Sequence, residues 1–343
     1  MGLGKNYVYL SADQVEGLRG YFIVWLADVA TTYLINARLN GALIKEKAGL
    51  LCEESRNIVG ELKKRIQNVC NLHPLPLTGN DKKEDFSICN AVDMICGYSD
   101  SRKESIFLQP ALSLEFTEYV RTFMPRKMLR KKDVVKVEPI LHGLAVMGAY
   151  LSHAYLDDQR HEWGYVFIDV PNPEAINYRK LSGMAIQVTK SVNQKEGDKL
   201  SLLVGVASAV ALIYKSALKS RPGSLPLKAN FVRLVKQPTQ NKVMLKAFEV
   251  LDLSSLARRV YEMNIALPVY SLISNYPSGE GHVLRSFVQR LSRAIVMSEL
   301  LNDYTEIYSA YRVISSENFL RELKTYENWR NILDGLLQVR IPM

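Results

Sequence analysis

The sequence lacks the short motifs that identify the common nucleotide-using and hydrolytic enzymes. Its 343 residues contain no G-x-x-x-x-G-K-[ST] phosphate loop, no G-x-S-x-G nucleophile elbow and no H-E-x-x-H zinc motif. No G-x-G-x-x-G dinucleotide loop follows a strand either. Nucleotide hydrolysis and serine hydrolase chemistry therefore have no support in the sequence, and we expect a protein that is not an enzyme and needs no cofactor.

Cysteine is also scarce, with four residues in the whole chain: Cys52, Cys70, Cys89 and Cys96. The opening MGLGKNYVYLSADQ lacks the apolar core of about 7–15 residues that a secretion signal needs. We therefore expect a cytoplasmic protein with reduced thiols. Cys70-x2-His73 and Cys89-x6-Cys96 are spaced less tightly than most zinc ligands, so we predict no metal, although the pattern leaves a metal at these residues open.

The apolar runs are too short or too interrupted to cross a membrane. LLVGVASAVALIY (202–214) lies between Lys199 and Lys215, which leaves 15 residues, whereas a spanning helix needs about 20. YFIVWLADVATTYLI (21–35) contains Asp28 and two threonines. Both segments are therefore predicted to be buried core helices, and no membrane partner is expected.

Short strands and longer helices follow one another irregularly, which predicts an α+β protein that is predominantly helical. In the first part we expect a strand at 5–11, helices at 12–39, 42–70 and 139–156, an extended segment at 133–138 and a strand at 164–170. The segments 87–98 and 174–192 fit either a helix or a strand. The polar stretch NQKEGDK (193–199) marks a boundary, which predicts a mixed α/β domain over 1–195 and a mainly helical domain over 196–343.

The second part begins with an apolar helix from about 200 to 218 and a Pro/Gly loop at 219–228. Residues 229–251 then read as a hairpin that turns at Gln237–Asn241, or as a strand that leads into a helix; we favour the hairpin. The remainder is predicted to be helical over 254–264, 282–301, 304–314 and 317–337.

Positive charge is concentrated in one quarter of the chain. The formal net charge is +9, and residues 215–300 carry thirteen cations against five acids, a balance of +8. Charge that serves only solubility would be spread along the chain, whereas binding to phosphates favours a cluster, because each Lys or Arg on a phosphate releases a counterion. We therefore predict nucleic-acid contacts by the cations of this loop and hairpin: Lys215, Lys219, Arg221, Lys228, Arg233 and Lys236.

A second basic segment is RKMLRKK (126–132), with five cations in seven residues. It follows Pro125, which suits the first turn of a helix. At about 100° per residue, four of its cations would fall within one arc of about 140°. We predict a second contact track on the same polyanion, formed by Arg126, Lys127, Arg130, Lys131 and Lys132.

Other functions fit parts of the sequence. Phe231, Tyr261, Tyr270 and Tyr276 are interleaved with the cations and could stack on bases, or could be ordinary core residues. A metal-dependent nuclease could be built from His153, Asp157 and His161, since the first two would share one face of a helix at i, i+4. A structural adaptor with a basic face for acidic protein partners is a third possibility.

Two segments carry a resemblance to a known family. YLSHAYLDDQRHEWGYVFIDV (150–170) and GDKLSLLVGVASAVALIYKSALKSRPGS (197–224) each place a helix before a strand or a basic loop. In this the chain resembles the archaeal large subunit of the type I-A CRISPR interference complex, Cascade, over about half its length. That family has no invariant catalytic motif, so the likeness is one of overall pattern.

The resemblance implies a role that is not enzymatic. A large subunit of this kind belongs to an antiviral ribonucleoprotein, where it contacts guide RNA and target DNA, helps to recognise the short motif beside the target and helps to open the duplex. Its other partners are the remaining subunits of the complex and a separate helicase-nuclease that cuts. Guide pairing reads the sequence in such complexes, and the protein handles backbone and a short motif.

Overall fold

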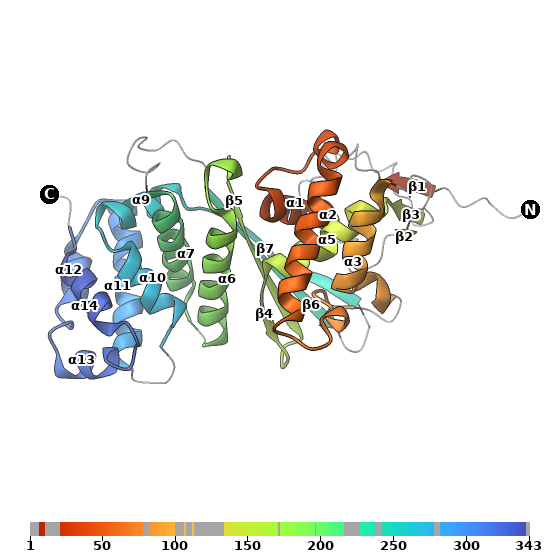
Figure 1. The fold of residues 1–343 in the computed structure, drawn as a ribbon. Coiled ribbons are helices and arrows are strands. Elements are labelled where there is room, and N and C mark those ends of the chain that lie inside the picture. Colours follow the sequence, from red (N-terminus) through yellow and green to blue (C-terminus); the bar gives the residue numbers. More distant parts are fainter. Residues whose placement is uncertain are drawn as a thin grey trace, which may run out of the picture. The chain divides into compact units, whose positions relative to one another are not determined.

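The chain forms a predominantly helical α+β fold in a computed structural model, which confirms the predicted fold class (Figure 1). It divides into two compact units: unit 1 comprises Met1–Tyr165 and Val232–Phe248, and unit 2 comprises Val166–Phe231 and Glu249–Met343. The structure describes residues 7–10, 21–77, 82–99, 106–107, 112, 134–170, 172–195, 197–215, 227–237, 242–277 and 282–340.

The domain boundary expected near residue 195 falls inside unit 2. It lies between helices α6 (Tyr178–Gln194) and α7 (Lys199–Ile213), which pack against each other. Each unit instead contains two stretches of chain that are distant in sequence. This arrangement cannot be read from composition, because the crossings between the units fall within strands rather than in polar linkers.

The core of unit 1 is built around helix α5 (Pro139–Ser152), which packs against α1 (Phe22–Ile35) and α3 (Ile88–Cys96). Nearly every residue of α5 is buried, which explains why PILHGLAVMGAYLS is apolar on all sides. Helix α1 is the segment that was expected to be a core helix, and it is one. None of the helices in the described part of the chain is both long and apolar enough to span a membrane.

Two glycines allow α5 to approach its neighbours closely. A Cβ atom at Gly148 would overlap the backbone carbonyl of Leu26 in α1, and one at Gly143 would lie 2.6 Å from the carbonyl oxygen of Ala91 in α3. Both obstacles are backbone atoms, which cannot move aside as a flexible side chain can. The spacing between these helices is therefore set by the absence of side chains at two positions of α5.

Gly148→Ala should destabilise the protein by about 3 kcal/mol or more, because the added methyl group forces α5 away from α1 and disrupts a close-packed core. Gly60→Ala is the matched control, since Gly60 lies in α2 (Gly41–Lys63) and no atom is within 4 Å of a Cβ there. This control should raise stability by about 0.5–1 kcal/mol through helix propensity. Urea unfolding of both variants measures the difference, and equal stabilities would contradict the close approach.

All four cysteines form disulfides, so the expectation of reduced thiols is wrong. Cys52 of α2 (Gly41–Lys63) pairs with Cys96, and Cys70 of the short 3-10 helix Val69–Asn71 pairs with Cys89. Cys89 and Cys96 both belong to α3. Folding places α2 beside α3 and brings the two Cα pairs to 4.7 and 5.0 Å, within the range that a disulfide bridges. The spacings of 44 and 19 residues gave no hint of this pairing, because it depends on helix packing.

Reducing both disulfides should lower the free energy of unfolding by about 2–4 kcal/mol per bond, since each restricts the unfolded chain. Urea unfolding with and without a thiol reductant measures the loss. A variant with all four cysteines replaced by alanine should be insensitive to the reductant. Titration of four free thiols in the unreduced, denatured protein would contradict the pairing.

His142 is a fully buried imidazole in α5. Its ring lies 5.4 Å from the ring of Phe86, and neither ring nitrogen has a hydrogen-bond partner among the described residues. Burial penalises the charged imidazolium and lowers the pKa of His142 from 6.5 to about 4. The folded protein therefore holds this side chain neutral at physiological pH.

Stability should decrease as the pH falls from about 6.5 to about 4, because only the unfolded chain takes up a proton at His142 in this interval. The loss should approach roughly 1.4 kcal/mol per pH unit. Unfolding measured across this range should show a shallower slope for His142→Leu and an unchanged slope for the exposed control His73→Gln. A His142→Leu slope equal to that of the unmodified protein would contradict the argument.

The strands form two small sheets. In the first, β1 (Tyr7–Leu10) runs parallel to β3 (Val134–Val137), which pairs on its other side with β2 (Ile106–Phe107). In the second, the order is β4-β5-β6-β7, with antiparallel pairing of β4 and β5. Its strands are β4 (His153–Asp157), β5 (Glu162–Asp169), β6 (Lys228–Gln237) and β7 (Lys242–Asp252).

Three predictions concern residues of this second sheet. The expected strand at 164–170 is β5, and the favoured hairpin is confirmed because β6 and β7 are neighbours in the sheet. The single helix expected over 139–156 is wrong. Helix α5 ends at Ser152, and His153 begins β4, whose pairing with β5 overrides the helical pattern of HAYL.

Unit 2 is a helical bundle around α7, which contacts α6, α9, α10 and α11 (Figure 1). The apolar run 202–214 thus lies in a core helix, as expected. Gly205 of α7 permits close packing, since a Cβ there would lie 2.7 Å from side-chain atoms of Val188 and Ile273. The helices after the sheet are α9 (Ser254–Glu262), α10 (Ala266–Ser274), α11 (Val283–Leu301), α12 (Thr305–Tyr311), α13 (Glu317–Leu323) and α14 (Trp329–Leu337).

Candidate nucleic-acid interface

Seven of the predicted contact residues lie outside the described part of the chain. The second track is among them in full, and so are two cations of the Pro/Gly loop: Arg126, Lys127, Arg130, Lys131, Lys132, Lys219 and Arg221. The predictions for these seven residues stay predictions. The four predicted contacts that the structure describes are Lys215, Lys228, Arg233 and Lys236.

Lys215 and Lys228 belong to unit 2. Lys215 follows the end of α7, and Lys228 is the first residue of β6. Both are exposed, and neither forms an ion pair within the described residues. Their ammonium groups are therefore open to an anion.

Arg233 of β6 belongs to unit 1 and lies in a cross-strand cluster with a second cation. Glu162, the first residue of β5, accepts a hydrogen bond of 2.5 Å from Lys246 Nζ and lies 4.0 Å from Arg233 Nη1. The Glu162 side chain is 6% exposed, whereas those of Arg233 and Lys246 are 40% and 45% exposed. One buried carboxylate thus holds two partly exposed cations on neighbouring strands. We call these three residues the Glu162 cluster.

Tyr155 of β4 completes the hydrogen bonding of this carboxylate. Its hydroxyl group donates to Glu162 Oε1 at 2.9 Å. Burial, together with this hydrogen bond to an anion, raises the pKa of Tyr155, so the phenol stays protonated and remains a donor. Gly164 is the partner of Tyr155 across the strands, and a Cβ at Gly164 would overlap the tyrosine ring. The glycine therefore leaves the space in which the donor lies.

The Glu162 cluster combines one carboxylate with two cations. A nearly buried carboxylate needs compensating cations, since an unpaired buried charge is costly. Two cations lie against Glu162, and both project part of their side chains into solvent. Both cationic side chains are therefore accessible to an external anion, while their contact with Glu162 limits their conformational freedom.

Lys236 lies in the same strand as Arg233 but three positions further on, so the two side chains emerge on opposite faces of β6. Lys236 shares its face with Val232 and Leu234, which are in the core. Its backbone N–H donates to the carbonyl oxygen of His161 at 3.0 Å. The structure therefore does not place Lys236 beside Arg233 in one contact surface.

Cations on the later helices are engaged with carboxylates. Arg258 pairs with Glu262 at 2.7 Å, Arg259 with Glu299 at 3.1 Å and Arg293 with Glu306 at 3.7 Å. Two of the interleaved aromatic residues, Phe231 and Tyr276, are core residues and cannot stack on a base. The charge excess of the 215–300 region is thus partly neutralised in its helical part.

The geometry does not assemble the alternative nuclease site. His153 and Asp157 are in a strand, not a helix, so their i, i+4 spacing separates their Cα atoms by roughly 13 Å. His161 lies in the turn between β4 and β5 with a φ of 49°. Among the described residues, no group of three His, Cys, Asp or Glu side chains could hold a metal ion.

Sequence reasoning did not select Glu162 or Lys246 as site residues. Lys246 was counted in the basic region, but nothing in the sequence distinguished it from its neighbours. Glu162 is separated from Arg233 by 71 positions, and the pairing of β5 with β6 brings them together. An acid at the start of a strand that is otherwise largely apolar and buried, EWGYVFID, was the available signal.

Comparison of the chain with protein-family models, with curated proteins and with solved structures finds no match.

Proposed function

We propose that this protein is a nucleic-acid-binding subunit of a ribonucleoprotein, without catalytic activity of its own. The observation that carries the proposal is the Glu162 cluster, in which one buried carboxylate contacts two partly exposed cations, Arg233 and Lys246. A nucleic-acid backbone presents phosphates that such a pair can contact, and electrostatic contacts of this kind supply most affinity that is independent of sequence. The net charge of +9 attracts the same partner.

The resemblance to the large subunit of type I-A CRISPR complexes extends the proposal to particular partners. These would be guide RNA, target DNA, the other subunits of the complex and its helicase-nuclease. The proposal includes a cytoplasmic location in an archaeon. The two disulfides are compatible with it, because intracellular proteins of hyperthermophilic archaea are an exception to the rule that cytoplasmic thiols are reduced.

Arg233→Gln combined with Lys246→Gln should weaken binding to single-stranded and duplex nucleic acid by about tenfold or more at moderate salt, since two phosphate contacts are lost. The dependence of affinity on salt should also become shallower, by roughly 0.7–0.9 per contact in the slope of log K against log salt. Fluorescence anisotropy with labelled DNA and RNA over a salt series measures both quantities.

Arg258→Gln combined with Arg293→Gln is the matched control. It also removes two positive charges, but from arginines that are paired with carboxylates on helices of unit 2. An equal loss of affinity in both variants would show that total charge alone determines binding, and it would reject the Glu162 cluster as the site. Lys246→Gln alone, which leaves Arg233 beside Glu162, serves if the double variant is unstable. Absence of nucleic-acid binding at any salt would instead favour the adaptor with acidic protein partners.

A further inference from the structure

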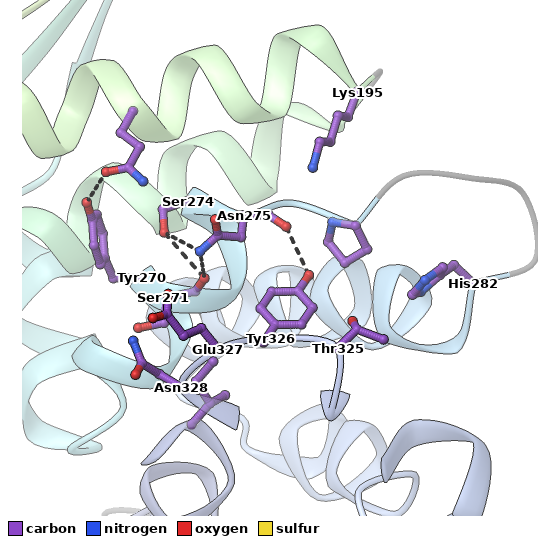
Figure 2. Close-up of a pocket in the computed structure, with 13 residues that line it drawn as sticks. Lys195, Tyr270, Ser271, Ser274, Asn275, His282, Thr325, Tyr326, Glu327 and Asn328 are labelled. Carbon is purple, nitrogen blue, oxygen red and sulfur yellow. Dashed lines mark hydrogen bonds between the residues drawn. The ribbon is translucent and has the colours of Figure 1, made fainter. Parts of the chain in front are cut away.

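Unit 2 contains a hollow of about 530 Å³ whose lining is mostly polar. It lies among the end of α6, the end of α10, the start of α11 and the segment that joins α13 to α14 (Figure 2). A volume of several hundred Å³ is typical of sites for small ligands. The hollow is separate from the Glu162 cluster, which belongs to unit 1.

Several polar groups of the hollow have unused hydrogen-bonding capacity. Lys195 and Asn328 have no side-chain hydrogen bond or ion pair within the described residues. Gln187 accepts a hydrogen bond from the Tyr270 hydroxyl group at 3.1 Å through its oxygen, which leaves its two amide N–H donors for a ligand. A concave surface with convergent unpaired donors and acceptors is what recognition of a polar molecule requires.

Two tyrosine rings in the lining are held in place by their hydroxyl groups. Tyr326 donates to the backbone carbonyl oxygen of Asn275 at 2.9 Å, and Tyr270 donates to Gln187. His282 Nδ1 lies 2.7 Å from Glu322 Oε2, a carboxylate oxygen that also accepts the Leu284 N–H at 2.7 Å. These side chains would lose little conformational freedom when a ligand binds.

The two ends of the hollow differ in chemistry. Figure 2 shows Lys195 and His282 toward one end and Tyr270, Glu327 and Asn328 toward the other, with the Tyr326 ring between them. The first end offers an unpaired ammonium group to an anion. The second end offers the amide of Asn328 and the carboxylate of Glu327. The amide can donate and accept hydrogen bonds and the carboxylate can accept them, so together they suit a polar ring or a pair of hydroxyl groups.

A nucleotide has the matching polarity. Its phosphate is the anion that a free lysine binds, its base presents a flat face to tyrosine rings, and its ribose hydroxyls and base edge pair with amides and carboxylates. We propose that this hollow binds a single nucleotide, with the phosphate toward Lys195 and the base and ribose toward Asn328. The nucleotide can be a free molecule or one residue of a bound strand.

Isothermal titration of the full chain with AMP and with adenosine tests this site. Lys195→Ala should weaken AMP binding about tenfold, the effect of losing one hydrogen bond to a charged group. Adenosine has no phosphate, so its affinity should be the same for this variant and for the unmodified protein. Asn328→Ala should weaken both ligands. Competition by an adenylate hexanucleotide shows that the site accepts a strand, and AMP binding without competition identifies a free nucleotide as the ligand.

The matched control is Lys190→Ala, which removes an exposed lysine from the same helix but outside the hollow, and which should leave AMP binding unchanged. Absence of AMP binding at millimolar concentration would overturn the proposal, and so would AMP binding that neither Lys195→Ala nor Asn328→Ala alters. The inference is independent of the proposed function, because Arg233→Gln with Lys246→Gln should not change AMP affinity. Failure at one site therefore leaves the other standing.

Discussion

The close approach of α5 to α1 and α3 is the constraint from which the rest of unit 1 follows. Helix α5 has almost no exposed side chain, and Gly143 and Gly148 allow its backbone to touch the backbones of its neighbours. Because β4 begins at the residue after α5 ends, this packing also sets where the hairpin of β4 and β5 starts. Glu162 opens β5, so the position of the buried carboxylate depends on helix packing in the core.

Local patterns in the sequence were sufficient to predict much of the secondary structure. The strand β5, the core helix α7 and the hairpin of β6 and β7 all have clear periodicity or strong flanking turns. Helix α10 was missed, since ALPVYSLIS is short and contains Pro268. The helix expected over 317–337 is divided into α13 and α14, whose separation by a short turn places Tyr326 and Asn328 in the lining of the hollow.

The candidate sites were harder to foresee than the fold, for a physical reason. Charge counting finds a basic region but does not distinguish a cation held by Glu162 from one neutralised by Glu262 or Glu299. That distinction depends on strand register and helix packing across long separations in sequence. The cysteines show the same limit, because their pairing follows from the contact of α2 with α3 and not from their spacing.

The route of the chain between the two units has a consequence for how the protein can be divided. The polypeptide passes from one unit to the other three times, after Tyr165, after Phe231 and after Phe248. A fragment that stops near residue 195 would keep β5 but lose β6, and with it the neighbour that covers one edge of β5. Such a fragment would expose a strand edge that favours aggregation. Expression of either unit alone would therefore require joining its two separate stretches by an artificial linker.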